Sequence, residues 1–89
     1  MGYYRKIPMT VEARQTGQSY DEDCEIMAWC GGYYPEGPDD GAIFAIATLE
    51  GPHIVRHGAW VVKGYAGEFW AIDPDIFAAT YEVVEAWDR

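Results

Sequence analysis

Residues 42–50, AIFAIATLE, constrain the fold most strongly, because their side chains are apolar at both odd and even positions as far as Ala47. Successive side chains of a strand point to opposite faces, so this pattern predicts a central strand that is covered on both faces. A chain of 89 residues buries roughly 60–65 % of its unfolded surface, which is enough for one modest core. We therefore expect a single domain over residues 1–89.

Other segments show the patterns of partly exposed strands. Apolar and polar residues alternate over residues 6–14, which predicts an edge strand that begins near Pro8. Residues 53–64, HIVRHGAWVVKG, are expected to form one bent strand or two short ones, with Gly58 at the bend. The loop 64–67 then leads into EFWAI, and TYEVVEAW, residues 80–87, is expected to be the last strand. These patterns predict about five mostly antiparallel strands in a curved or partly open, barrel-like sheet.

Helix-start and helix-stop signals bound one long helix. Ser19 and Glu22 match a capping box, acidic residues fill the first turn, and the glycine pair 31–32 ends the segment. These signals predict a helix over residues 19–30. The face expected to be buried carries Tyr20, Cys24, Met27 and Cys30, with Ile26 beside them.

A second, shorter helix is expected near the end of the chain. Asp73 is in the position of an N-cap, Pro74 suits the first helical position, and Asp75 favours the first turn. The expected helix covers residues 74–79. Strands combined with two helices make the expected class α+β.

Charge and hydropathy exclude several functions. The net charge of −9, with only six basic residues, argues against direct nucleic-acid binding, which needs clustered Lys and Arg. No membrane span or signal peptide is recognisable, so we expect a cytoplasmic protein without membrane contact. The acidic runs at 21–25 and 36–40 are either solvated faces or docking surfaces for a basic partner, including mimicry of DNA phosphates.

No convincing catalytic or metal site emerges. Cys24 and Cys30 lie six residues apart on the expected helix, roughly 9 Å along its axis, so two reduced thiols are expected rather than a disulfide. Catalysis by either thiol with His53 or His57 is disfavoured, because both cysteines are expected in an apolar core, which raises the thiol pKa. A zinc site is disfavoured because four residues of strand separate the two histidines by roughly 13 Å. The acids Asp73, Asp75 and Glu82 have structural explanations in helix-start chemistry and strand exposure. We predict no catalytic residue, no metal and no cofactor.

Aromatic residues supply the main functional signal. Four Trp, seven Tyr and three Phe exceed what so small a core encloses, and several lie near ends, loops or helix rims, including Tyr3, Tyr4 and Tyr65. Trp29 is expected at the rim of the helix, packed on a loop or open to a partner, and the Tyr33–Tyr34 pair is expected to fold onto the core or to form a contact surface. The predicted partner-binding residues are Asp21, Glu22, Glu25, Trp29, Tyr33, Tyr34, Glu36, Asp39 and Asp40.

A small-molecule site is the alternative hypothesis. Its pocket would stack a nucleotide base on an aromatic ring and hold phosphate with a cation, and oligomerisation could assemble these groups across an interface. The candidate residues are Arg56, Trp60, Lys63, Phe69 and Trp70, with Arg14 as a further cation.

The second half of the chain resembles a family of small bacteriophage and prophage proteins. The resemblance rests on TLEG at 48–51, on HGAWVVKGYAGEFWAIDPDIFAATYE at 57–82, and on the opening RKIPMTVEARQTG. It is carried most specifically by Gly51, Gly58, Trp60, Gly64, Gly67, Glu68, Phe69, Pro74, Asp75, Phe77, Thr80 and Tyr81. The sequence departs from the family pattern at Ala59, where an acid is usual, and at His57, where proline is common. The loop 31–41 also has no counterpart in that pattern.

The resemblance implies a phage origin, a host-cytoplasm setting and no established enzymatic activity. It also implies structural roles for the recurrent turn and helix positions, with Glu68 anchoring the hairpin by accepting backbone hydrogen bonds. The first hypothesis is therefore a non-enzymatic binding protein that modulates or inhibits a host protein, including one that serves defence. A sponge for a nucleotide signal is the alternative, and a structural or accessory phage protein is a lesser one.

Overall fold

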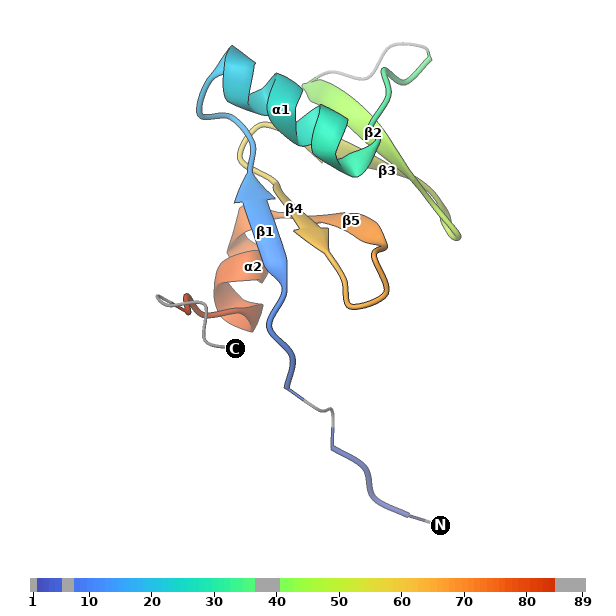
Figure 1. The fold of residues 1–89 in the computed structure, drawn as a ribbon, viewed down its shortest axis with the longest axis vertical. Coiled ribbons are helices and arrows are strands. Elements are labelled where there is room, and N and C mark those ends of the chain that lie inside the picture. The colour runs from blue at the N-terminus through green and yellow to red at the C-terminus, as the bar shows by residue number, and fades with distance from the viewer. Residues whose placement is uncertain (1, 6–7, 37–40, 85–89) are drawn as a thin grey trace.

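The computed structural model describes residues 2–5, 8–36 and 41–84 of the chain. The elements occur in the order β1 (Glu12–Gln15), α1 (Tyr20–Cys30), β2 (Ala42–Thr48), β3 (Gly51–Arg56), β4 (Trp60–Lys63), β5 (Phe69–Ile72) and α2 (Pro74–Thr80) (Figure 1). The strands form two antiparallel sheets, β1-β4-β5 and β2-β3, and the described strands do not close into a barrel. The expected small α+β fold is confirmed.

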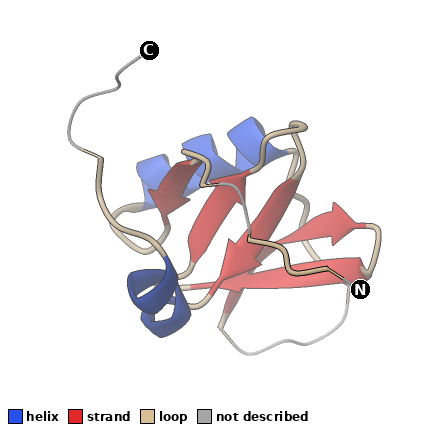
Figure 2. Cartoon of the chain, turned by 90° about the horizontal axis from the view of Figure 1, so that it is seen from below, coloured by secondary structure: helices blue, strands red, loops and turns tan. Residues whose placement is uncertain are grey.

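The core lies between α1 and the two sheets. Its buried side chains are Ile26, Cys30, Phe44, Ile46, Val55, Ala59 and Val61. Strand β5 contacts both β2 and β3, which brings the two sheets against one another. Figure 2 shows the strands in the middle of the molecule, with the two helices apart from each other on the outside.

Strand β2 is buried as predicted, but it has fewer strand neighbours than expected. Phe44, Ala45 and Ile46 are 2 % exposed or less. Along one edge β2 pairs with β3. Along the other, among the described residues, it pairs with the backbone of Tyr33, which exchanges two hydrogen bonds with Ala45 at 2.7 and 2.9 Å. A loop residue therefore takes the place of the second neighbouring strand.

The β2–β3 hairpin owes its tight turn to the TLEG segment. The Thr48 hydroxyl donates to the Gly51 carbonyl oxygen at 2.6 Å and accepts from the Glu50 N–H at 3.2 Å. Gly51 has φ +108°, which a residue without Cβ adopts readily. The turn leaves Leu49 fully exposed at the hairpin tip.

The register of the three-stranded sheet separates its aromatic residues onto two faces. Lys63 lies opposite Phe69, and Val62 lies opposite Trp70, so Lys63 and Phe69 share one face while Val62 and Trp70 share the other. Trp29 of α1 packs edge-on against Phe69, with ring centroids 5.0 Å apart. Helix α2 covers the other face, where Phe77 stacks on Trp60.

Both terminal strands differ from their predictions. Of the expected strand 6–14, residues 8–11 are not in a strand, and β1 begins at Glu12, which pairs with the last residue of β4, Lys63. Residues 6 and 7 lie outside the described residues. The expected strand 80–87 is wrong as far as the structure describes it, since Thr80 ends α2 and residues 81–84 are not in a strand. Tyr81 stacks on Phe77 instead, at 4.9 Å between centroids, so the chain follows α2 rather than a sheet edge. Residues 85–87 lie outside the described residues.

The ends of α1 match the prediction, but its buried face is rotated. Ser19 caps the helix by accepting from the Glu22 N–H at 3.1 Å, and Gly31 ends it with φ +68°. Of the residues expected on the buried face, Cys30 and Ile26 are buried and Met27 packs against the core, whereas Tyr20 is 77 % exposed. Asp23, which lies outside the expected face, is buried as well. The rotation is compatible with a buried acid because Asp23 receives a backbone hydrogen bond from the segment after β1.

The start of α2 is confirmed in part. Pro74 occupies the first turn, and the Asp73 carbonyl accepts from the Phe77 N–H at 2.9 Å. The Asp73 side chain makes no capping hydrogen bond, so its expected side-chain role as N-cap is wrong. Backbone geometry and proline alone start this helix.

Candidate functional site

A groove lies beside the first half of α1. Its volume is about 320 Å³. It lies between α1, the segment after β1, the start of β2 and the β3–β4 turn. Its lining residues are Gly17, Ser19, Tyr20, Asp23, Cys24, Met27, Tyr34, Ala42, Ile43, Phe44 and His57. We call this hollow the α1 groove.

Asp23 is the buried polar group of the α1 groove. It is only 8 % exposed. Its Oδ1 accepts a hydrogen bond from the Gly17 N–H at 2.9 Å, and its Oδ2 accepts none from the residues that the structure describes. Asp23 lines the groove, and its Oδ2 is open to solvent there, because no buried side-chain oxygen of the described residues lacks a hydrogen-bond partner.

Gly17 supplies the close contact between the segment after β1 and the β3–β4 turn. Its φ is +90°, and a Cβ placed on it would lie 2.9 Å from the Gly58 nitrogen and 3.3 Å from Nδ1 of His57. Glycine therefore serves here both for its conformation and for its lack of a side chain.

Thr16 fixes the same turn from inside the protein. It is fully buried, and its hydroxyl lies 2.9 Å from the Arg56 carbonyl and 3.0 Å from the Ala59 carbonyl. Its backbone N–H donates to Ala59, and its carbonyl accepts from Gly58. These bonds hold the turn that brings His57 to the α1 groove.

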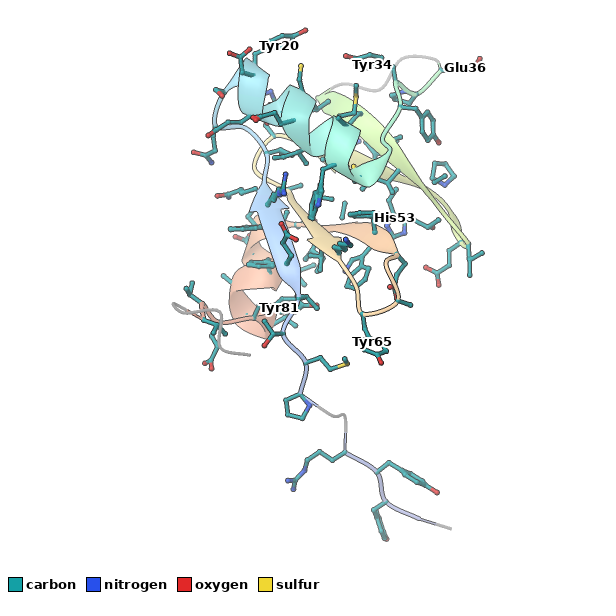
Figure 3. The ribbon with its side chains drawn as sticks, in the orientation of Figure 1. Tyr20, Tyr34, Glu36, His53, Tyr65 and Tyr81 are labelled. Atoms are coloured by element: carbon teal, nitrogen blue, oxygen red, sulfur yellow. The ribbon has the colours of Figure 1, made fainter. Side chains whose placement is uncertain are left out.

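Two tyrosines border the α1 groove on its solvent side. Tyr20 is 77 % exposed and Tyr34 67 %, and Figure 3 shows both at the end of the molecule where α1 begins. The pKa of Tyr20 is raised, chiefly by its hydrogen bond with the Cys24 side chain. The negative charges that Cys24, Tyr34 and Asp21 carry when ionised raise it further. The two phenols are therefore close enough to influence each other.

Helix α1 divides the predicted partner-binding residues. Tyr34 lies on the side of the helix that carries Tyr20, Cys24 and Met27. Glu22 and Glu25 line a separate, polar hollow of about 300 Å³ on the other side. That hollow also contains Arg14, Gln15, Gln18 and Ile26.

Trp29 is engaged inside the molecule rather than open. It is half-buried, packs against Phe69, and has the Arg14 guanidinium 4.1 Å from its ring centroid. Arg14 also forms a salt bridge with Glu12 at 3.0 Å. Of the two locations considered for Trp29, the packed one is observed, although against a strand and not a loop.

The remaining predicted partner-binding residues are exposed or lie outside the described part of the chain. Asp21 and Glu36 are exposed, and Tyr33 is half-exposed while its backbone pairs with β2. Asp39 and Asp40 lie outside the described residues. The structure therefore gathers Tyr20, Tyr34 and Asp23 at one groove and leaves Glu22, Glu25 and Trp29 on the opposite side of the helix.

The residues of the alternative ligand site are not brought together. Trp60 and Trp70 lie on the α2 face of the sheet, whereas Lys63 and Phe69 lie on the other face. The Trp60 ring is already stacked on Phe77. Arg56 ends β3 in the other sheet. None of these five residues lines either hollow.

The cysteines and the potential metal ligands form no reactive or metal-binding cluster among the described residues. Cys24 and Cys30 are free cysteines, in agreement with the expected reduced thiols. Burial raises the pKa of the Cys30 thiol, which disfavours its use as a nucleophile. Within residues 2–5, 8–36 and 41–84, no group of three histidine, cysteine or acidic side chains is placed to hold a metal ion.

The recurrent turn positions have structural explanations in the fold. The glycines Gly51, Gly58 and Gly67 all have positive φ. Glu68 accepts a hydrogen bond from the Ala66 N–H at 2.9 Å, which is the backbone contact expected from the sequence. At Gly64 a Cβ would lie 2.5 Å from the Glu68 carboxyl carbon, so glycine there makes room for this acid.

Sequence reasoning missed Asp23, Gly17 and Thr16 as parts of the site. A glycine two residues before a helix cap, followed by an acid in the first turns of that helix, was the available signal.

In three comparisons with known proteins, no protein-family model, no curated protein and no solved structure matches this chain. No helix in the described part of the chain has the length and apolar character needed to cross a membrane.

Proposed function

We propose that this chain is a non-enzymatic binding protein that docks on a basic protein partner through the surface around α1. The supporting observation is the charge of that surface. Between Arg14 and Gly41 the sequence has seven carboxylates and no lysine or arginine. Asp21, Glu25 and Glu36 in this stretch are exposed. Acidic surface next to exposed tyrosine favours a protein partner with complementary charge.

The setting of the proposal follows from the resemblance to small phage and prophage proteins. We propose that the chain is phage-encoded, acts in the host cytoplasm, and modulates or inhibits a host protein. A role against host defence and an accessory role in the phage are both compatible with this activity.

The nucleotide-sponge alternative gains no support from the site. Its aromatic residues lie on two faces of one sheet, and the α1 groove has the carboxylate of Asp23 and no lysine or arginine in its lining. Such a lining repels phosphate, because like charges at close range are unfavourable in a partly buried site.

The proposal is tested by affinity capture from host lysate, followed by binding measurements with each purified host protein recovered. The test variant is Glu25→Lys with Glu36→Lys. The matched control is Glu50→Lys with Glu82→Lys, which makes the same charge change at the β2–β3 hairpin tip and after α2. All four side chains are exposed.

We expect the test variant to weaken binding about tenfold or more and the control less than threefold, with affinity falling as salt rises. Equal losses in the two variants, or an affinity that is independent of salt, would contradict the proposal. Recovery of no host protein would do the same.

A further inference from the structure

We propose that the α1 groove binds a primary alkylammonium group, and that this group is a lysine side chain of the basic protein partner. The inference rests on the proposed function and names the chemistry at its centre. The ammonium group binds Asp23, the alkyl stem lies along the apolar lining, and the phenol rings of Tyr20 and Tyr34 border the entrance.

The carboxylate of Asp23 supplies the charge. One of its oxygens is bonded to Gly17, the other accepts no hydrogen bond from the described residues, and no lysine or arginine lines the groove. His57 is the one basic side chain in the lining, and it is exposed. Oδ2 is open to solvent in the groove, because none of the described buried side-chain oxygens lacks a hydrogen-bond partner. A cationic donor in the groove would replace this solvent contact with a charge-assisted hydrogen bond.

The geometry favours an ammonium over a guanidinium. Arginine binds carboxylates best through two parallel N–H···O bonds, which require both oxygens. At Asp23 the Gly17 N–H already donates to Oδ1, so a guanidinium that bound both oxygens would have to share Oδ1 with that N–H. An ammonium group needs only Oδ2, which has no donor among the described residues.

The walls and the entrance suit the rest of a lysine side chain. Met27, Ile43 and Phe44 line the groove beside Asp23, and they offer apolar contacts for four methylene groups. Tyr20 and Tyr34 add aromatic rings on the solvent side, and a cation is attracted to the face of such a ring. Charge, stem and ring contacts therefore converge in one hollow.

The test uses the full-length, ¹⁵N-labelled protein and four small probes, followed through its backbone amide signals. The probes are the methylamides of Nα-acetyl-lysine, Nα-acetyl-norleucine and Nα-acetyl-arginine, and 1,5-diaminopentane. Norleucine keeps an alkyl stem and lacks the ammonium, and the diamine represents a free amine rather than a protein side chain.

We expect the lysine probe to shift the amides of Gly17, Cys24 and Tyr34, with binding about tenfold tighter than the norleucine and arginine probes. Asp23→Asn should weaken lysine binding about tenfold, since the amide oxygen still accepts from Gly17 while the charge is lost. Glu50→Gln is the control, because it removes one charge at the exposed tip of the β2–β3 hairpin. Tyr34→Ser, at an exposed loop position, is a second variant that should weaken binding even if Asp23→Asn does not fold.

Norleucine binding equal to lysine binding would overturn the ammonium assignment, as would equal or tighter arginine binding or shifts confined to other regions. Tighter binding of diaminopentane than of the lysine probe would reassign the groove to free amines. If Asp23→Asn keeps full affinity for the purified partner while Glu25→Lys with Glu36→Lys loses it, this inference fails and the proposed function stands.

Discussion

The indole ring of Trp60 lies flat on the ring of Phe77, with 4.2 Å between the centroids and 8° between the planes. Tyr81 continues the stack on the other side of Phe77. Helix α2 has no fully buried residue, so this column of three rings is its main attachment to the sheet.

Replacing Phe77 by alanine should therefore loosen α2. The variant loses the buried part of one ring and two stacking contacts, and we expect the free energy of unfolding to fall by about 2 kcal/mol. Ile76→Ala, at a 58 % exposed neighbouring position, should cost much less. Urea unfolding of both variants makes the comparison, and equal losses would mean that the stack does not hold the helix.

A comparison of alanine variants at Gly17 and Gly67 distinguishes the cost of backbone strain from the cost of steric crowding. Both have positive φ, but a Cβ at Gly67 would meet no atom within 4 Å, whereas one at Gly17 would lie 2.9 Å from backbone. Gly67→Ala should cost about 1 kcal/mol for its backbone conformation alone, and Gly17→Ala about 3 kcal/mol. Thermal unfolding measures both variants, and similar costs would show that the turn next to Gly17 adjusts freely.

Thr16→Val tests the buried hydroxyl at the β3–β4 turn. The substitution keeps the shape of the side chain and removes the donor near two carbonyl oxygens, so we expect a loss of about 2 kcal/mol. The same change at the exposed Thr10 should leave stability within about 0.5 kcal/mol. Amide hydrogen exchange at Gly58 and Ala59 should also accelerate in Thr16→Val, and unchanged exchange would contradict the assigned role.

The contribution of Cys30 to the free energy of unfolding should decrease as pH rises through the alkaline range. Its pKa is raised in the folded protein, so the unfolded chain ionises first as pH rises. The protonated Cys30 thiol makes its full contribution to the free energy of unfolding below the ordinary thiol pKa of about 8.5. This contribution declines as pH rises from there toward the raised pKa of the folded protein. In a Cys24→Ala background, the stability advantage of Cys30 over Cys30→Ala should therefore shrink between pH 8 and pH 10.

Alkylation gives a second readout of the same group. In the Cys24→Ala protein, N-ethylmaleimide should label Cys30 about tenfold more slowly when the protein is folded than in guanidinium at pH 8. Mass spectrometry follows the reaction. Equal rates in the folded and unfolded protein would show that the thiol is accessible and not protected by burial.

Local signals predicted much of this fold, because they act over a few residues. The Ser19 cap, the glycines that end α1 and form the hairpin turns, and Pro74 at the start of α2 each act within their own turn. The terminal strands were predicted less well, since an alternating pattern at residues 6–14 or 80–87 shows an amphipathic segment and not whether a partner strand lies beside it. Whether such a segment forms a strand depends on its pairing with another strand in the tertiary structure.

The site was only partly predictable for a similar reason. Tyr34 was identified as a contact residue from its place in a glycine-rich loop. The burial of Asp23 depends on how α1 is rotated about its axis, and that rotation is set by packing with β2 and by the hydrogen bond from Gly17. Neither of these two contacts can be predicted from the periodicity of apolar residues in the sequence.

The pairing of β1 with β4 has a consequence for how the chain is made. Glu12 lies opposite Lys63, so about fifty residues must be synthesised after β1 before β4, its partner among the described strands, exists. The β2–β3 hairpin is complete before β4 leaves the ribosome, while β1 still lacks this partner. Strand β1 is thus synthesised before the other described strands, but it cannot pair with β4 until β4 has followed.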